Sequence, residues 1–442
     1  MNAVNPKTSL LRKGALAGLA GAWLLLGSAC SKPEPKPSGD NLEDLVEYYD
    51  TAGRTMKKAE GKARYGRKEG PWQEFSPGGD VIGRGAYEAG ERQGTWEFFY
   101  PAAPGGPDPE KGQPKQSKGG YVHGMQDGEW VSWYPSGQLA KRENYKEGVL
   151  DGPQESYHEN GQLSERAVFQ LGLEHGQHEA WYASGAPIFS MLYQEGKMQG
   201  ELKELHENGE VSHTLNFIDG QPDGWERRFY ASGKPALELK YVEGKPVGQQ
   251  IEFYEDGTVK SRIPFENGLR QGIEEMFHPN GAKAVALPWV EGKRQGPNFS
   301  WFPDGTLQLR ADFVDDALEG AAMTYHPSGK TAAEGSYHQG KQQGLWRSYY
   351  DNGNLQQLVP YVDGAVTGWT QEWFIGGERK SAGTYQAGRL EGPFVLWNQD
   401  GSLDNRAGQY LNARRQMDLT PEQLEKAGAY YKNPEPDAPR PW

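Results

Sequence analysis

Nine histidines and one cysteine are the side chains of this 442-residue sequence that most readily bind metal ions or take part in catalysis. Four histidines share one column of a repeating pattern, whose other copies hold mainly tyrosine and phenylalanine: His158, His206, His278 and His326. Copies two repeats apart would lie about 20 Å from each other, too far to share a metal ion. His175 and His178 flank one turn, but zinc would need further ligands that the sequence does not indicate. We therefore expect no metal site.

Carboxylates and glycines also recur, and each suggests a chemistry that its surroundings do not support. One turn of the pattern is acidic in seven copies: Glu147, Glu195, Asp219, Glu243, Glu291, Asp315 and Asp363. Calcium requires six or more oxygen ligands, so one carboxylate per turn favours a solvated turn instead. The recurring G-x-x-x-G lacks the Lys-Ser/Thr of a phosphate-binding loop. Because an active site is a singular constellation and these features repeat, we expect no enzymatic activity and no cofactor.

These residues are positioned by a repeat of 24 residues. Aromatic residues recur from Tyr121 to Tyr385 at steps of 24, without an insertion or deletion. Counting each as position 0, position 7 and position 16 are always glycine, and position 12 is aromatic in all copies but Leu205. We predict that positions 0 and 12 form the core of a thin sheet, with these residues as its main members: Tyr121, Trp133, Tyr145, Phe169, Trp181, Tyr241, Trp289, Trp301, Tyr337, Trp373 and Trp397.

Each repeat is predicted to form a β-hairpin. Asn-Gly and Asp-Gly dipeptides such as Asn160-Gly161 and Asp256-Gly257 mark one turn, where glycine supplies a positive φ. After this turn apolar and polar residues alternate, as expected for a half-buried strand. About fourteen such hairpins predict an all-β fold, an elongated antiparallel meander in a single layer, about 130 Å long.

A second aromatic column follows directly after position 12. Since side chains alternate along a strand, position 13 points to the opposite face from position 12. Two interpretations stay open for this column: an exposed ladder that grips a polysaccharide or a protein, or rings covered by neighbouring side chains. Its aromatic members are Tyr134, Tyr182, Tyr230, Tyr254, Phe302, Tyr350 and Phe374.

The N-terminal segment predicts export and lipid anchoring. Lys7, Arg12 and Lys13 precede an apolar stretch of 13 residues, and small residues then lead to Cys30, the only cysteine. This order resembles a bacterial lipoprotein signal, which implies that Cys30 is lipidated and becomes the mature N-terminus. Ser31 after the cysteine favours the outer membrane of a Gram-negative cell, and the proline-rich residues 32–40 predict an extended spacer.

The chain therefore divides into a signal peptide at 1–29, a lipidated tether at 30–40, a helical cap at 41–60, and the repeat array at 61–408. A loop is expected at about 101–118 within the array. Residues 409–442 are expected to form a helix and a proline-rich tail, because Thr420-Pro421-Glu422-Gln423 is a capping box.

The repeat resembles the MORN repeat variant. The motif Y-x-x-G-x-x-x-G-x-W-x-x-Φ-Y-x-x-G-x-L, where Φ is aromatic, is best matched by Tyr121–Leu139 and Tyr337–Leu355. The resemblance covers roughly residues 61–408 and implies an elongated single-layer antiparallel sheet used for scaffolding and protein contact. Bacterial proteins of this variant are often named as antitoxins, which implies a toxin as the partner.

Charge and pattern together favour binding over catalysis. The net charge of −13 disfavours nucleic acid and anionic lipid as partners of the array. We expect a non-catalytic, membrane-anchored scaffold of the cell envelope that binds a protein partner. A polysaccharide- or peptidoglycan-binding module is the first alternative, because aromatic stripes also suit glycans, and an antitoxin or immunity protein is the second.

Overall fold

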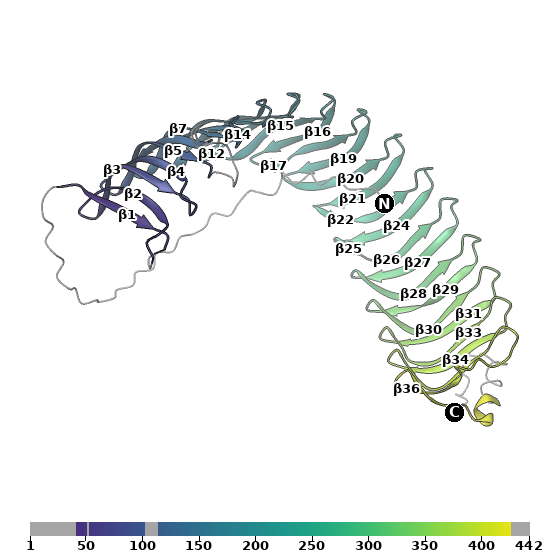
Figure 1. Cartoon of the computed structure of the whole chain (residues 1–442). Helices are drawn as coiled ribbons and strands as arrows, with labels where there is room; N and C mark the ends of the chain where they lie inside the picture. Colours follow the sequence, from purple (N-terminus) through teal and green to yellow (C-terminus); the bar gives the residue numbers. More distant parts are fainter. Residues whose placement is uncertain (1–40, 51–52, 102–113, 426–442) are drawn as a thin grey trace, which may run out of the picture.

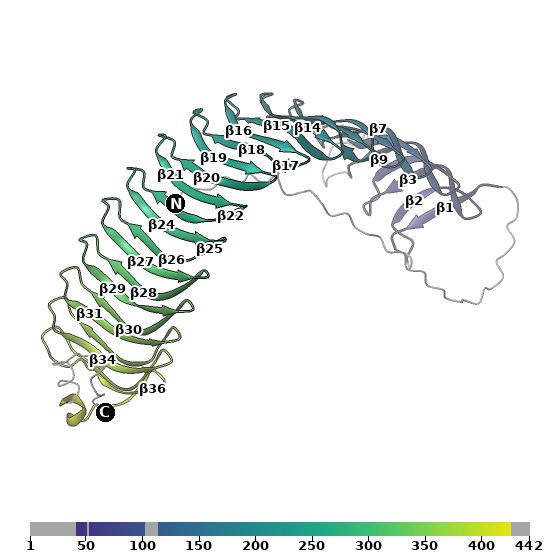
Figure 2. The same cartoon turned by 180° about the vertical axis from the view of Figure 1, so that it is seen from behind.

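The computed structural model describes residues 41–50, 53–101 and 114–425. In this part of the chain, 37 β-strands form one continuous antiparallel sheet that curves into an arch (Figure 1). The view from behind shows the same open ribbon with its two ends far apart (Figure 2). The predicted all-β meander of hairpin repeats is thereby confirmed. No helix of the described residues is long and apolar enough to cross a membrane.

The strands follow one another along the sheet in sequence order. The first group is β1 Glu43–Tyr48, β2 Lys57–Arg64, β3 Arg67–Phe75, β4 Val81–Glu88, β5 Glu91–Phe99, β6 Lys115–Val122, β7 Met125–Trp133, β8 Leu139–Lys146, β9 Val149–Leu150, β10 Gly152–Tyr157, β11 Leu163–Gln170 and β12 Leu173–Glu174. The second group is β13 Gly176–Trp181, β14 Pro187–Gln194, β15 Lys197–Leu205, β16 Val211–Ile218, β17 Gln221–Pro222, β18 Gly224–Phe229, β19 Pro235–Val242, β20 Lys245–Phe253, β21 Val259–Glu266, β22 Leu269–Arg270, β23 Gly272–Phe277 and β24 Lys283–Val290. The last group is β25 Lys293–Arg294, β26 Gly296–Trp301, β27 Leu307–Val314, β28 Ala317–Tyr325, β29 Thr331–His338, β30 Lys341–Tyr349, β31 Leu355–Val362, β32 Ala365–Val366, β33 Gly368–Trp373, β34 Arg379–Gln386, β35 Arg389–Leu396, β36 Gly408–Leu411 and β37 Arg414–Met417.

Each repeat contributes one strand over positions 4–12 and a second over positions 18–25. The glycine at position 7 has a positive φ, for example 75° at Gly128, and lets the first strand bulge. In six repeats this irregularity divides the first strand, which gives the two-residue strands β9, β12, β17, β22, β25 and β32. The glycine at position 3 lies in the other turn and links it to the preceding repeat, since the Gly148 amide donates to the Gln126 carbonyl at 2.8 Å.

The expected helical cap at 41–60 is wrong. Residues 43–48 and 57–64 are strands β1 and β2, which pair antiparallel from Glu43–Ala63 to Tyr48–Lys57. Leu45 also packs against the buried cluster of Ala59, Trp72 and Trp96. Pairing of β1 with the open edge of the first repeat gives the backbone N–H and C=O groups of that edge hydrogen-bond partners along a whole strand. A short surface helix would leave these groups unpaired.

Two other boundaries also differ from the expectation. Residues 115–118 of the expected loop lie in β6, which pairs with β5. The sheet continues past residue 408 through β36 and β37, because Tyr410 takes the place of one more position-0 ring opposite Gly392. A single helical turn at residues 421–425 follows, and the capping box closes it: Thr420 and Gln423 each bind the backbone amide of the other.

The two faces of the sheet carry different positions of the repeat and are here called face A and face B. Face A carries positions 0, 9 and 22, as shown by Tyr121 edge-on to Trp130 with ring centroids 5.2 Å apart. Face B carries positions 12, 18 and 21, as shown by the Arg166 guanidinium 5.7 Å from the Trp181 ring. Positions 0 and 12, expected to share a core, therefore lie on opposite faces of a sheet that is one layer thick.

The most buried rings of face A stand at position 9. Trp72 and Trp96 are at most 2% exposed, and Trp96 donates its indole N–H to the Ala86 carbonyl at 3.0 Å. Each of these rings covers a glycine in the preceding strand: a Cβ on Gly85 would lie 2.3 Å from Trp96. The same arrangement recurs at the pairs Gly61 and Trp72, Gly119 and Trp130, and Gly335 and Trp346.

Candidate binding surface

The position-13 column lies at the hairpin-loop edge of the sheet and ties each repeat to the next. All seven of its predicted ladder members are half-buried: Tyr134, Tyr182, Tyr230, Tyr254, Phe302, Tyr350 and Phe374. The hydroxyl of Tyr254 donates to the Phe277 carbonyl at 2.8 Å, and Tyr134, Tyr182, Tyr230 and Tyr350 make the corresponding bond. Histidine alternates with tyrosine here because its Nε2 reaches the same carbonyl, as in His158 to Trp181 at 2.8 Å.

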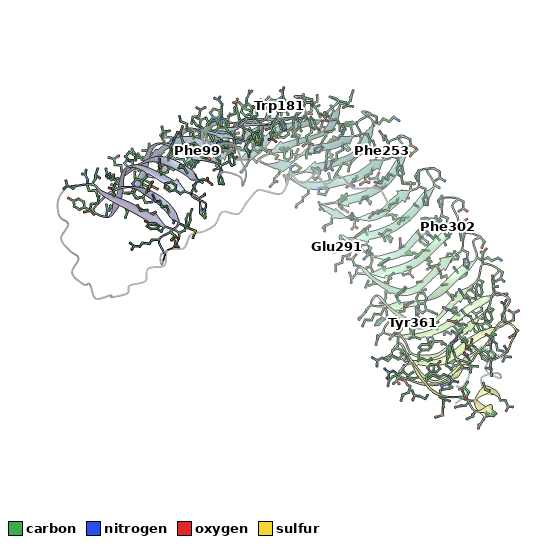
Figure 3. All side chains as sticks on the ribbon, in the orientation of Figure 1. Phe99, Trp181, Phe253, Glu291, Phe302 and Tyr361 are labelled. Carbon is green, nitrogen blue, oxygen red and sulfur yellow. The ribbon has the colours of Figure 1, made fainter. Side chains whose placement is uncertain are left out.

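The acidic turn lies at the opposite edge. Figure 3 shows Glu291, at position 2, on the other long edge from Phe253 and Phe302. Its residues adopt a left-handed conformation, with φ of 51° at Glu291. The side chain of position 6 in the preceding repeat accepts the backbone amide of this turn, as Gln271 does from Glu291 at 2.8 Å. Both edges thus use side-chain-to-backbone hydrogen bonds to lock neighbouring repeats together.

Two histidines lie on face A among carboxylates, His213 buried and His178 half-buried. His178 lies 2.8 Å from Glu165 and 3.4 Å from Glu174. Burial alone would lower the pKa of His178, but hydrogen bonds to these two carboxylates outweigh it and raise the pKa to about 9. His213 between Glu204 and Glu226 behaves alike, with a pKa also raised to about 9. Among the described residues, no group of three or more such side chains could hold a metal ion.

The other predicted site residues fall in three places. Cys30, the expected lipidation site, lies outside the described residues together with the tether. The predicted core aromatics of position 0 are half-buried on face A: Tyr121, Tyr145, Phe169, Tyr241, Trp289 and Tyr337. Those of position 12 lie on face B, where Trp373 and Trp397 are buried and the others half-buried: Trp133, Trp181 and Trp301.

Face B carries a feature that the 24-residue frame does not reveal, here called the apolar row. From residue 217 onward every repeat places one apolar side chain at position 8 or 10 of its first strand: Trp225, Ile251, Ile273, Phe299, Met323, Leu345, Trp369 and Val395. Both positions share a face with position 12, as the stacking of Phe299 on Trp301 at 5.9 Å shows. Comparing the residue types at positions 8 and 10 separately in the second half of the sequence would have revealed the apolar row.

The first half of face B has a different chemistry at the same two positions. Before residue 217 these positions are mainly polar or charged, and they include Glu97, Glu129, Glu155, Glu179 and Glu201. The first four of these carboxylates pair across strands with basic residues at position 21, for example Arg84 with Glu97 and Arg142 with Glu129 at 3.4 Å. The apolar row is therefore a property of the second half of the array and not of the repeat itself.

The C-terminal end of the apolar row is covered by the chain. Trp369 is 8% exposed and Val395 is fully buried, and together with Trp373 they belong to one cluster on face B. Leu419 and Leu424, which flank and end the C-terminal helical turn, pack against this cluster. At the other end of the row Trp225 is 45% and Ile273 is 57% exposed. The row thus has an accessible section from Trp225 to Met323, here called the open reach, and a C-terminal section that the chain itself covers.

Comparisons with known proteins agree with the repeat architecture. The MORN repeat variant matches at residues 126–147, 150–170, 246–267, 318–339 and 342–363. No curated protein matches the sequence. Solved structures titled "Crystal Structure of TcdB2-TccC3-Cdc42" and "Crystal Structure of TcdB2-TccC3" are 10% identical over 82% of this chain, with TM-scores of 0.12 and 0.13. The chain spans only 23% of those chains, and so low a likeness supports no argument. The chain therefore contains repeats of the MORN repeat variant.

Proposed function

We propose that the protein is a non-catalytic scaffold that binds a protein partner along the apolar row. The observation that carries this proposal is the apolar side chain that every repeat of the second half of the array places on face B. Trp225 and Ile273 are exposed two repeats apart on this face, with the half-buried Ile251 in the repeat between them, and contiguous apolar patches on otherwise polar proteins mark interaction surfaces. The chain's own Leu419 and Leu424 already occupy the far end of this row, which supports its capacity to bind an apolar segment.

The cell envelope remains our proposed location, with Cys30 as the lipid anchor. The signal-like segment before Cys30 and the proline-rich spacer after it support this proposal. A Cys30→Ala variant should lose its membrane association in a bacterial host, as measured by fractionation and by incorporation of a labelled fatty acid. An unchanged membrane fraction with this variant would contradict the anchor.

Photo-cross-linking tests the protein-binding function directly. A photoreactive amino acid at Ile273 of the full chain should give a discrete cross-linked product in the native host. An identical probe at Gln177, which is exposed at position 8 in the first half of the array, is the matched control. Products at both sites, or at neither, would contradict the proposed surface. A toxin, as the naming of family members suggests, would be identified by mass spectrometry of the product.

A polysaccharide ligand would give a different result. The position-13 rings are half-buried and their tyrosine and histidine members are bonded to the next repeat, which leaves the open reach of the apolar row as the more accessible apolar surface. Retention on envelope glycan that Trp225→Glu and Ile273→Glu leave unchanged would favour the glycan-binding alternative over the scaffold.

A further inference from the structure

The spacing of the apolar row selects one kind of ligand. Successive members lie one repeat apart, and a two-stranded repeat advances the sheet by about 10 Å. An α-helix advances about 10.5 Å in seven residues, so that every seventh side chain of a helix lying along the sheet meets the next member of the row. An extended peptide advances about 3.3 Å per residue, and its side chains alternate between two sides. Side chains on one side therefore recur about every 6.6 Å, which does not match the spacing of about 10 Å between members of the apolar row.

The chain's C-terminal segment shows which flanking charges this face accepts. Leu419 and Leu424 point to the buried cluster of Trp373, while Asp418, Glu422 and Glu425 make the same segment acidic. Arg415 of the neighbouring strand β37 pairs with Asp418. An acidic segment with leucines on its inner side is thus compatible with face B in the place where the row is filled.

Basic side chains flank the open reach in a way that suits carboxylates. Arg227, Arg262 and Arg310 lie on face B beside the row, and their side chains are 46%, 43% and 46% exposed. Their nearest carboxylate oxygens are 3.6, 4.0 and 3.9 Å away, longer than a charge-assisted hydrogen bond. These guanidinium groups have donors left for a ligand, since each carries five N–H groups.

We infer that the open reach from Trp225 to Met323 binds an amphipathic α-helix of a partner protein, with apolar side chains at every seventh position and carboxylates on its flanks. This inference rests on the proposed function and names the partner's chemistry. The helix lies along the length of the sheet, across the strands. Its apolar residues meet Trp225, Ile251, Ile273, Phe299 and Met323 in turn, and its carboxylates meet the three arginines.

Synthetic peptides test the inference on the full-length protein without its natural partner. The probe is a fluorescein-labelled helical peptide of 28 residues, about 42 Å long, with leucine at every seventh position and glutamate on both flanks. Fluorescence anisotropy should show saturable binding that weakens with rising salt. A peptide of identical composition with leucines at every fifth position is the spacing control, and it should bind at least about tenfold more weakly.

Variants of the protein locate the binding site. Ile273→Glu should weaken binding of the probe about tenfold, because it buries a carboxylate against a leucine. Gln177→Glu, at the same exposed position 8 in the first half of the array, adds the same charge outside the row and should leave binding unchanged. Circular dichroism of both variants shows whether the sheet is intact, and both changes lie at exposed positions.

The possible results separate this inference from the proposed function. Equal binding of the two peptides, or loss of binding in Gln177→Glu as much as in Ile273→Glu, would overturn the helix inference. If the probe behaves as expected while no protein cross-links at Ile273 in the host, the row binds helices but the proposed function fails. A specific cross-linked protein whose binding segment is not helical would retain the function and refute the inference.

Discussion

The clearest quantitative prediction concerns Gly85 and Trp96, the glycine and tryptophan that lie on top of each other on face A. A Cβ on Gly85 would lie 2.3 Å from Cδ2 of Trp96, and the ring is fully buried with no room to retreat. The Arg92 guanidinium lies 4.3 Å from the ring centroid, and Tyr87 packs edge-on at 5.2 Å. Gly85→Ala should therefore lower the free energy of unfolding of this region by about 3 kcal/mol.

A double-mutant cycle isolates the cause of that loss. Trp96→Ala alone should cost about 4 kcal/mol, because it leaves a cavity in the thin core of face A. In the double variant the methyl group introduced by Gly85→Ala has the space of the missing ring, so the combined cost should be about 4 kcal/mol and not the additive sum of about 7 kcal/mol. The expected coupling of about 3 kcal/mol exists only if the steric contact is the reason why glycine is required.

Local stability must be measured here, since a long repeat array need not unfold in one step. Hydrogen exchange of backbone amides in β3 to β6 reports the free energy of opening for these repeats, while strands β26 to β30 of the same sample serve as an internal reference. Ala167→Gly, with exchange read in β10 to β13, is the matched control, because position 22 there accommodates a buried Cβ. Costs that add to within about 0.5 kcal/mol in the double variant would refute the reasoning.

Three further predictions follow from the geometry. Tyr254→Phe removes one inter-repeat hydrogen bond and should lower the free energy of unfolding in urea by about 1 kcal/mol. Tyr325→Phe should cost less, because the Tyr325 hydroxyl lies 3.5 Å from the sulfur of Met323, which is a weak acceptor. Because the pKa of His213 is raised to about 9, its stabilisation is complete below pH 6.5 or so and is lost as the pH rises through 9. A His213→Gln variant should show a smaller loss of stability over this range than wild type, the remaining part coming from His178. Leu419→Asp with Leu424→Asp should uncover the tryptophans of the C-terminal cluster and shift their fluorescence to the red, and an unchanged spectrum would contradict the packing.

The repeat period could be predicted from the sequence because it is a local property. Turn glycines, the alternation of apolar residues and the 24-residue spacing of rings each act within one hairpin, so the meander of hairpins follows from them. The capping box at Thr420 belongs to the same class, since its bonds join residues three positions apart. These features depend on backbone geometry and not on what lies across the sheet.

Tertiary structure decided what the pattern left open. Residues 43–48 became an edge strand because the first repeat offered it a partner, which no local signal reveals. The rings of positions 0 and 12 lie on opposite faces because each position-0 ring pairs with position 7 of the preceding repeat, five residues before position 12, as Tyr145 does with Gly128. The role of position 9 depends on a glycine in the neighbouring strand. The position-13 tyrosines find their partners 23 residues ahead, at a carbonyl whose position only the stacking of repeats defines.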